Sequence, residues 1–384
     1  IRPAKLWNDT TTAPDAGWLI GQLDGGAAEW SDRCGSVPLA AFTIAKLSWL
    51  HRSEPENWSR VAGVCLPHDW LTLQLSGSLV TDRGDASGTG YWSPRDGSYD
   101  LDLLRVVDTE LNWAEMLPEV HHHLDVVGEW NGASVAAGTG DNMAGALGLG
   151  LGTGDVAVSI GTSGTVYSVS DEPTQDPTGA VAGFADATGR YLPLVCTLNA
   201  AKVTDTVRSL MGCSIDEFEQ LAMQGGAPSG ALPVLVPYFD GERTPNLPDA
   251  TGKITGLRTG TTREQLALSA VTGVVCGLLD GLDALGAAGA RTDGAMWVTG
   301  GGARSAVYRQ VLADCSGRVV HTSPIDEAVA AGACVQAVAV LERADPLEVR
   351  ASWNVGEVPL TEPRETDIDG VRERYSEAAE ATSN

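Results

Sequence analysis

Short apolar runs that end in glycine-rich turns recur through the later part of the chain and constrain its fold most strongly. Ser134–Ala137 leads into Gly138-Thr139-Gly140-Asp141-Asn142, and Ala295–Val298 leads into Gly300-Gly301-Gly302. Each turn is followed by a segment with the small and apolar residues of a helix. Strands that alternate with helices across glycine turns predict an α/β protein.

A β-hairpin and a long helix are the clearest individual elements. The alternating segments Asp155–Ile160 and Thr165–Ser170 flank Gly161-Thr162-Ser163-Gly164, which predicts two strands joined by a tight turn. Further on, Thr261-Thr262-Arg263-Glu264 has the pattern of a capping box. The helix that it opens carries small residues at a spacing that lets another element pack closely: Ala270, Gly273, Gly277 and Gly281.

The earlier part of the chain predicts short helices and loops. Ala41–Leu50 and Leu66–Leu75 are apolar at helical spacing, whereas Thr81–Pro94 is dense in Gly, Asp and Ser and predicts an ordered loop. A length of 384 residues exceeds what one hydrophobic core usually supports. We therefore predict two domains, residues 1–130 and 131–384.

Charge and cysteine content exclude several classes of partner. The net charge is −25, so nucleic acid and anionic membranes are poor partners, although backbone amides and a metal can still bind one nucleotide. The seven cysteines are scattered without a C-x-x-C pair, which argues against a disulfide framework or a zinc site. No run approaches about 18 uninterrupted apolar residues, so we predict no membrane span and a cytoplasmic location.

The common nucleotide and hydrolase motifs are absent from the chain. It contains no G-x-x-x-x-G-K-[ST], no complete G-x-G-x-x-G after a strand, no H-E-x-x-H and no G-x-S-x-G. A bound nucleotide would need another glycine architecture. The Gly161–Gly164 turn could direct N–H groups and two hydroxyls toward an anion, and Gly300–Gly302 could let a flat ring or a phosphate approach the backbone. An ordinary hairpin turn and a tight packing turn are the alternatives.

Asp141 has two interpretations that the local sequence leaves open. It stands between a strand and a helix, where Asp serves well as an N-cap. A carboxylate fixed there could also orient a hydroxyl and accept its proton late in phosphoryl transfer. The internal His121–His123 run has no further ligand nearby, so we predict no metal site there.

In their order along the chain, these motifs resemble the FGGY family of carbohydrate kinases up to about residue 345. Thr43–Leu50 is similar to the first signature of that family, and Gly252–Leu257 with Gln265-Leu266 and Ser269–Val271 is similar to the second. Thr272 stands where the second signature usually ends in an acidic residue. The resemblance implies an actin-like fold of two ribonuclease H-like domains around a central cleft.

Within the family, Leu66–Leu71 and Thr81–Thr89 are most similar to xylulokinases. The resemblance implies ATP-dependent phosphorylation of a ketopentose, D-xylulose at its 5-hydroxyl, with Mg²⁺ bridging the phosphates. Ribulose, gluconate and glycerol remain alternative substrates. The residues implied are Asp141 as catalytic base, Asn142 and Trp7 as sugar contacts, Gly161 and Thr162 at the phosphates, and Gly301, Gly302 and Ala303 at the adenosine.

Two elements of the family are missing from this sequence. They are an Asp-x-Gly-Thr hairpin, which contributes to the phosphate and magnesium site, and a Met-His-Gly element that closes over the sugar. We therefore expect the N-terminal domain to be incomplete, with roughly eighty residues absent before Ile1. A truncated, non-catalytic sugar- or nucleotide-binding remnant is the competing hypothesis, and a homodimer is left open.

Overall fold

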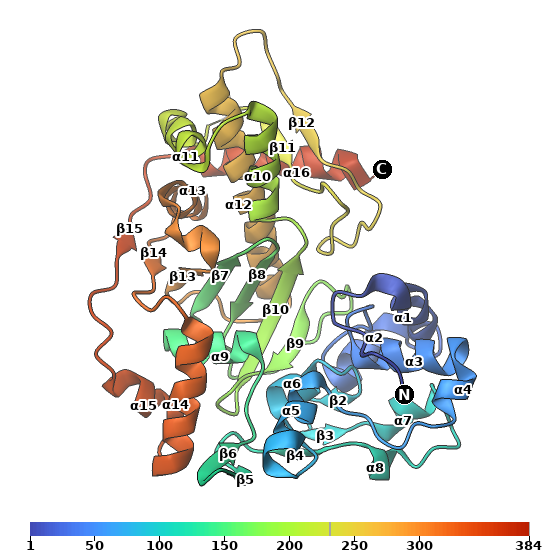
Figure 1. The fold of residues 1–384 in the computed structure, drawn as a ribbon. Coiled ribbons are helices and arrows are strands. Elements are labelled where there is room, and N and C mark those ends of the chain that lie inside the picture. The colour runs from blue at the N-terminus through green and yellow to red at the C-terminus, as the bar shows by residue number, and fades with distance from the viewer. Residues whose placement is uncertain (230–231, 384) are drawn as a thin grey trace. The chain divides into compact units, whose positions relative to one another are not determined.

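The computed structural model describes residues 1–229 and 232–383 and divides into two compact units (Figure 1). The first unit comprises Ile1–Leu151, Val169–Pro193 and Glu327–Asn354. The second comprises Gly152–Ser168, Leu194–Asp326 and Val355–Asn384. The chain therefore crosses between the units several times. The predicted boundary at residue 130 stays a prediction.

The first unit is mainly helical. Its helices are η1 (Thr10–Thr12), α1 (Ala13–Ile20), α2 (Gly26–Cys34), α3 (Thr43–Ser53), α4 (Pro55–Trp58), α5 (Pro67–Ser76), α6 (Arg83–Ser87), α7 (Leu101–Arg105), α8 (Trp113–Met116), α9 (Asp141–Leu149), α14 (Ala328–Glu342) and α15 (Pro346–Ser352). Its strands are β1 (Val80–Asp82), β2 (Trp92–Ser93), β3 (Ser98–Tyr99), β4 (Glu119–His121), β5 (Val126–Trp130), β6 (Ala133–Ala136) and β9 (Ala182–Ala185). β1 pairs with β4 in parallel, whereas β2–β3 and β5–β6 are antiparallel.

Large apolar side chains hold the helices of the first unit together. Trp30, Ile44, Leu103 and Leu104 are fully or almost fully buried in one cluster. The indole N–H of Trp30 donates to the carbonyl oxygen of Leu19 (3.1 Å), so the polar end of this core residue is also satisfied. The two helices predicted before residue 80 are present as α3 and α5.

The loop predicted over Thr81–Pro94 is wrong in part. This stretch contains the end of β1, the short helix α6 and β2. The Asp82 carboxylate accepts hydrogen bonds from the N–H groups of Gly84 (2.7 Å) and Asp85 (3.2 Å) and so caps α6. Of the residues that suggested a loop, Asp82 and Gly88 are the N-cap and C-cap of this helix, and Gly84, Asp85 and Ser87 lie within it.

The second unit is an α/β layer structure. Its strands are β7 (Val156–Ile160), β8 (Gly164–Ser168), most of β10 (Tyr191–Thr197), β11 (Val234–Val236), β12 (Lys253–Thr255), β13 (Met296–Thr299), β14 (Val320–Thr322) and β15 (Leu360–Thr361). Its helices are α10 (Ala201–Met211), α11 (Ile215–Gln224), α12 (Arg263–Ala287), η2 (Gly301–Arg304), α13 (Ala306–Ser316) and α16 (Ile368–Ser383). The strands run in the order β15-β14-β13-β7-β8-β10, with β7, β13 and β14 parallel to one another. The predicted hairpin is present as β7 and β8.

The start of α12 shows a capping box one residue later than predicted. Thr262 is the N-cap: its hydroxyl accepts from the Gln265 N–H (3.3 Å), and the Gln265 side chain accepts from the Thr262 N–H (3.2 Å). The predicted box at Thr261 and Glu264 is wrong because the Thr261 hydroxyl is used in the preceding turn, where it accepts from the Arg258 N–H (2.9 Å).

The small-residue stripe of α12 allows close packing, as predicted. A Cβ added to Gly273 would lie 2.1 Å from the carbonyl oxygen of Leu235, and one added to Gly281 would lie 3.1 Å from Cγ1 of Val195. By length and composition alone, α12 could cross a membrane, since its most apolar window has a mean hydropathy of 1.6. That window is 72% buried within the protein, as expected of a core helix.

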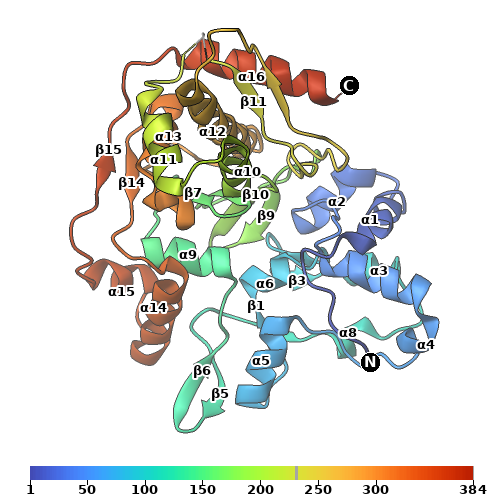
Figure 2. The same ribbon diagram turned by 45° about the horizontal axis from the view of Figure 1, so that its top comes forward.

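The polar segment after Thr361 contains the helix α16. This helix contacts β11, α12 and α13. Its buried residues Val371, Tyr375 and Ala378 recur at helical spacing, so a narrow apolar stripe docks an otherwise polar segment. Figure 2 shows α16 beside β11 and α12.

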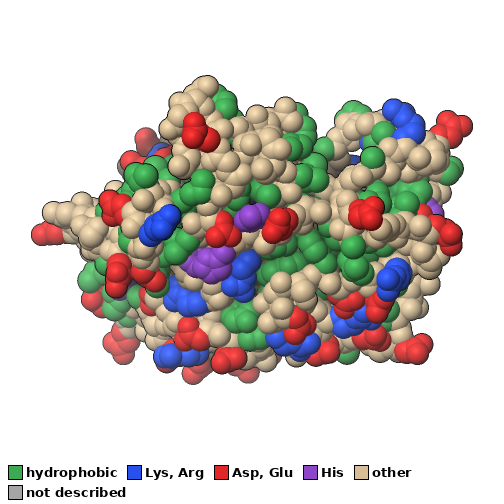
Figure 3. All heavy atoms as spheres, turned by 90° about the horizontal axis from the view of Figure 1, so that it is seen from below, with side chains coloured by type: hydrophobic (Ala, Val, Ile, Leu, Met, Phe, Trp, Pro, Cys, Tyr) green, Lys and Arg blue, Asp and Glu red, His purple; other side chains and the backbone are tan. Residues whose placement is uncertain are grey.

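Acidic side chains are dispersed in small groups over one face of the protein. In Figure 3, Asp and Glu side chains lie scattered over the visible face with Lys and Arg side chains between them. On this face, the acidic side chains are not concentrated in one patch.

Candidate functional site

Asp141 is the first residue of α9 in the first unit. The N-cap is Gly140, so the N-cap interpretation of Asp141 is wrong. The Asp141 carboxylate instead accepts from the backbone N–H (2.7 Å) and the side-chain amide (2.9 Å) of Asn142, and the side chain is exposed. Asp is common both at the N-cap and in the first turn of a helix. Here it is in the first turn, its carboxylate is exposed, and among the described residues its hydrogen bonds are to Asn142.

The helix that carries Asp141 is held by backbone contact with α14, which lies beside it (Figures 1 and 2). A Cβ added to Gly148 would lie 1.9 Å from the carbonyl oxygen of Ala328, and one added to Gly332 would lie 1.8 Å from that of Ala144. At the far end of α9, Nε of Arg350 donates to the carbonyl oxygen of Gly148 (2.6 Å). No side chain larger than hydrogen fits at either crossing glycine, which fixes the position of α9 against α14.

The turn before Asp141 is tied from α14 as well. Gln336 is buried, and its side-chain amide donates to the carbonyl oxygens of Gly138 (2.9 Å) and His123 (3.2 Å). Gly138 has a φ of +85°, a conformation that side chains other than hydrogen rarely adopt. The Gly138–Gly140 turn is therefore specific in shape and supported by a residue distant in sequence.

Trp7 lies in the segment before η1, and its side chain is 65% exposed. Residues of α3 hold this segment: Nζ of Lys46 donates to the carbonyl oxygens of Asp9 (3.0 Å) and Ala40 (2.7 Å). Burial lowers the pKa of Lys46. The ammonium of Lys5 lies 3.9 Å from the ring centroid of Trp49, a cation–π contact. The Thr43–Leu50 signature thus supports the segment that carries Trp7.

In the second unit, two glycine turns leave the same edge of the sheet. β7 and β13 are parallel neighbours, with Ser159 opposite Thr299, so the turns that begin at Gly161 and Gly300 follow adjacent strand ends. A Cβ added to Gly300 would lie 2.8 Å from the carbonyl oxygen of Ile160. In open α/β sheets, ligands bind beyond the carboxyl ends of parallel strands.

The Gly161–Gly164 turn offers fewer free amides than its sequence suggested. The Gly161 N–H donates to the carbonyl oxygen of Ser163 (3.0 Å) within the turn. The carbonyl oxygens of Gly161 and Thr162 accept from Ala201 (2.9 Å) and Ala200 (3.3 Å) at the start of α10. Thr162 is exposed. An anion at this turn would therefore meet Thr162 first, and not the Gly161 amide.

The residues of the Gly301–Ala303 segment differ in exposure. Gly301 is exposed, and a Cβ added to it would meet nothing within 4 Å. Gly302 and Ala303 are buried, and a Cβ added to Gly302 would lie 2.5 Å from Cγ2 of Ile160. The structure thus leaves Gly301 as the contact available to a ligand, whereas Gly302 makes the packing that shapes the turn.

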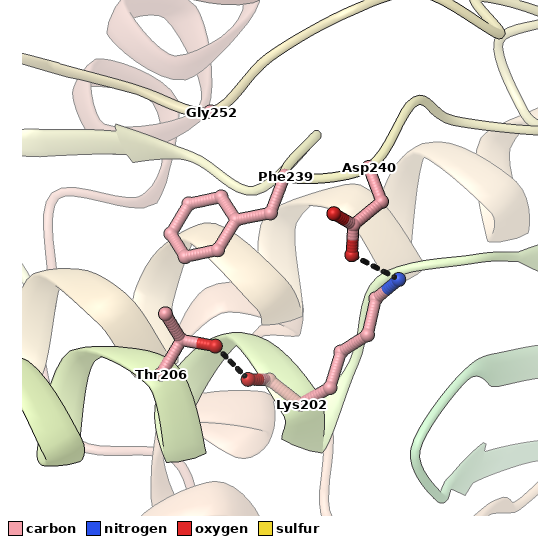
Figure 4. A pocket seen from close by; sticks show the side chains of 5 residues that line it. All are labelled: Lys202, Thr206, Phe239, Asp240 and Gly252. Carbon is pink, nitrogen blue, oxygen red and sulfur yellow. Dashed lines mark hydrogen bonds and ion pairs between the residues drawn. The ribbon is translucent and has the colours of Figure 1, made fainter.

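A pocket of about 360 Å³ lies in the second unit (Figure 4). It is lined by Lys202, Thr206, Phe239, Asp240 and Gly252. Nζ of Lys202 pairs with a carboxylate oxygen of Asp240 (3.2 Å), and the Thr206 hydroxyl donates to the Lys202 carbonyl oxygen (2.8 Å). The pocket combines one cation with an aromatic wall. Sequence reasoning missed Lys202 and Phe239, because no local motif marks either residue.

The architecture and the comparisons with known proteins together define the class. The solved xylulose kinase of Bifidobacterium adolescentis superposes with a TM-score of 0.85 at 37% identity, over 98% of this chain and 83% of that one. The gluconate kinase of Lactobacillus acidophilus superposes with a TM-score of 0.88 at 21% identity, over 98% and 79% of the two chains, which shows the fold alone. The expected actin-like α/β fold of two domains is confirmed.

The family follows from the sequence profiles. The N-terminal domain of the FGGY family of carbohydrate kinases matches residues 1–149, and its C-terminal domain matches residues 156–341. The xylulose kinase of Streptomyces coelicolor is 44% identical over 376 residues, which are 96% of this chain and 76% of that protein. The chain belongs to the FGGY family of carbohydrate kinases and is a carbohydrate kinase.

Proposed function

We propose that this kinase transfers the γ-phosphoryl group of ATP to the 5-hydroxyl of D-xylulose. The observation that carries the proposal is the 44% identity with the Streptomyces coelicolor xylulose kinase along 96% of the chain. The fold by itself does not select the sugar, since a gluconate kinase shares it at a TM-score of 0.88. Sequence identity along almost the whole chain therefore supports xylulose over gluconate.

Asp141 is the proposed general base. Its exposed carboxylate can accept the proton of the sugar hydroxyl while that oxygen attacks the γ-phosphorus and the bond to the bridging oxygen of ADP breaks. The side-chain amide of Asn142 (2.9 Å) fixes the direction of the carboxylate and is a proposed sugar contact. Trp7, with its exposed ring, is a second proposed sugar contact.

ATP is proposed to bind at the glycine edge of the second unit. Thr162, next to Gly161, would meet the phosphates, and Gly301, beside Gly302 and Ala303, would meet the adenosine. The open space at Gly301 and the pocket lined by Lys202 and Phe239 fit a nucleotide, which needs both a flat apolar contact and a cation. Mg²⁺, when bound with ATP, would neutralise charge on the phosphates. No residue of this chain is assigned to it.

The remaining elements of the proposal concern location and partners. We propose a cytoplasmic enzyme whose partners are the sugar and ATP, without nucleic acid or membrane. The net charge of −25 supports the lack of nucleic-acid and membrane partners, because it would repel phosphate backbones and anionic headgroups. A homodimer is a proposal for which light scattering or ultracentrifugation provides the test.

An ADP-release assay with a panel of sugars tests the substrate. D-xylulose should give the highest kcat/KM among xylulose, ribulose, gluconate and glycerol. A higher value for any other sugar would reassign the substrate within the family. Calorimetric binding of xylulose and ATP without ADP formation would instead favour a non-catalytic binding remnant.

A further inference from the structure

An imidazole and three carboxylates lie together beside the turn that precedes Asp141. His68 is on α5, Asp82 ends β1 and Asp85 is on α6. Nδ1 of His68 lies 3.4 Å from a carboxylate oxygen of Asp69, 3.4 Å from one of Asp85 and 3.8 Å from one of Asp82. One ring nitrogen thus faces three acidic groups from three elements.

Two of these carboxylates are removed from water, and Asp85 is partly exposed. Asp69 is 1% exposed and Asp82 is 3% exposed. Other oxygens of both residues are engaged, since Asp69 accepts from the Leu66 N–H (2.7 Å) and Asp82 caps α6. Oδ2 of Asp82, the oxygen nearest His68, is buried and has no hydrogen-bond partner. Such a buried carboxylate is costly when ionised. Burial and the charge of Asp85 raise the pKa of Asp82 to about 8, and the charge of His68 opposes that rise.

Within residues 1–229 and 232–383, His68 is the cation placed to neutralise the carboxylates of Asp69, Asp82 and Asp85. The strands β1, β5 and β6 pack against α5, and beyond Asp82 they contribute only Glu129, whose side chain is exposed. Arg83 follows Asp82 in the chain, but its guanidinium lies over the ring of Trp92 (5.9 Å to the centroid). Burial tends to lower the pKa of His68, but the hydrogen bond with Asp69 and the charges of Asp85 and Asp82 raise it to about 9.

The cluster forms one wall of the Gly138–Gly140 turn. A Cβ added to Gly138 would lie 2.3 Å from Nε2 of His68, and one added to Gly140 would lie 2.9 Å from Oδ1 of Asp85. Burial, and to a smaller extent the charges of Asp69 and Asp141, raise the pKa of Asp85. Asp85 therefore packs against the turn, and its charge interacts with that of Asp141.

We propose that His68 is a positioning residue: as an imidazolium it holds Asp82 and Asp85 together and so fixes the Gly138–Gly140 turn that directs Asp141. This inference rests on the proposed role of Asp141 as the base. His68 does not touch the substrate in this scheme. It acts through the shape of the turn.

The sign of the pH dependence follows from the direction of the shift. A histidine whose pKa is raised on folding stabilises the protein fully below its unfolded value of about 6.5. That stabilisation is lost as the pH rises through the folded value of about 9. Asp82, whose pKa is raised to about 8 by burial and by Asp85, becomes ionised over the same range. Above it, neutral His68 leaves the carboxylates to repel one another, and the turn should loosen.

The test combines nuclear magnetic resonance with kinetics on the whole chain. The ring signals of His68 should titrate near pH 9, and the amide signals of Thr139–Asn142 should move with the same midpoint. His68→Lys, which keeps the cation, should retain the amide positions at pH 7 and move the transition to higher pH. His68→Gln should displace them and lower kcat about tenfold to hundredfold, with the KM for ATP unchanged.

His51→Gln is the matched control, because His51 also faces an aspartate, Asp108 (3.8 Å), away from the turn. It should leave all these signals unchanged. If His68→Gln does not fold, the titration of the wild type and His68→Lys still decide the question. Altered amides in His68→Gln together with no turnover by the wild type on any sugar would leave the positioning role standing and remove the proposed function.

Two results would overturn the inference. One is a His68 signal that titrates at or below pH 6.5. The other concerns a metal, because ligand atoms of His68, Asp82 and Asp85 all lie within 4.8 Å of one another, a spacing that a divalent cation could also use. If Zn²⁺ or Mn²⁺ raises the unfolding temperature of the wild type and not of His68→Gln, the imidazole is a neutral ligand and not a counter-charge.

Discussion

The two units hold their candidate residues by different means. In the first unit, side chains from distant parts of the chain fix the turn before Asp141: Gln336 bonds the carbonyl oxygen of Gly138, and His68 packs against it. In the second unit, the edge is shaped by backbone, since Gly300 and Gly302 lie directly against Ile160. The first arrangement depends on charge and hydrogen bonding in addition to close glycine packing. The second depends on the absence of a Cβ.

This difference determines whether each unit should respond to a change of pH, to the loss of a partner or to added side-chain volume. A turn held by ionisable groups responds to pH and to loss of a partner, because buried charges need compensation. An edge made of glycine responds to added volume, because close-packed interiors resist even one methyl group. The substitutions below are chosen to separate these two kinds of sensitivity.

The largest effect is expected at Asp141. Asp141→Asn keeps the shape of the side chain and removes the proton acceptor, so kcat for the sugar should fall about 10²- to 10⁴-fold. The unfolding temperature should not change, because the side chain is exposed. Steady-state kinetics and thermal unfolding measure the two quantities. Turnover at the wild-type rate would show that Asp141 is not the base.

Next in size is a methyl group at the crossing of α9 and α14. Gly332→Ala places a Cβ 1.8 Å from the carbonyl oxygen of Ala144, so the helices must separate. We expect a loss of about 3 kcal/mol or more in the free energy of unfolding, measured by denaturant titration. Gly17→Ala on α1 is the control, since its Cβ would meet nothing within 4 Å. It should be neutral or stabilising by about 0.5–1 kcal/mol. Equal losses from both variants would contradict the packing argument.

A smaller effect is expected from two adjacent glycines of the second unit. Gly302→Ala directs a Cβ to 2.5 Å from Cγ2 of Ile160 and should cost about 1–3 kcal/mol of stability. Gly301→Ala meets open space and should leave stability unchanged. If the adenosine lies against Gly301, that variant should still weaken ATP binding about tenfold in calorimetry. Unchanged ATP affinity in Gly301→Ala would move the adenosine away from this turn.

The elements that sequence alone predicted are those that local patterns determine. The β7–β8 hairpin, the strand before Gly300 and the small-residue stripe of α12 each follow from alternation, turn chemistry or spacing within a short segment. Errors arose where one residue type suits neighbouring positions. Asp141 begins its helix but does not cap it, and Thr262, not Thr261, is the N-cap of α12.

The candidate site was predictable as a set of motifs but not as a geometry. Gly161 and Gly300 lie at one edge only because β13 pairs with β7, strands that are far apart in the chain. The supports of the Asp141 turn, His68 and Gln336, belong to segments whose local patterns indicate only that they are helices. Tertiary contacts of this kind leave no signal within a short window, which is why His68, Gln336 and Lys202 were missed.

The smallest expected effect concerns pH and a second histidine of the first unit. Burial, with the charge of His122 next in size, lowers the pKa of His123 to about 4. When a histidine has a lowered pKa in the folded state, the protein loses stability as the pH falls from the pKa of the unfolded state, about 6.5, toward 4. Amide exchange in α9 and α14 should therefore accelerate over that range, with less change in β7 and β13.

His123→Asn removes the titrating group and should flatten this acid dependence while leaving the alkaline one, which we assign to His68. His123 should thus reduce the stability of the first unit at acid pH, and His68 should reduce it at alkaline pH. Equal acceleration of exchange in β7 and β13 would show that pH sensitivity is not a property of the unit whose turn is held by charge.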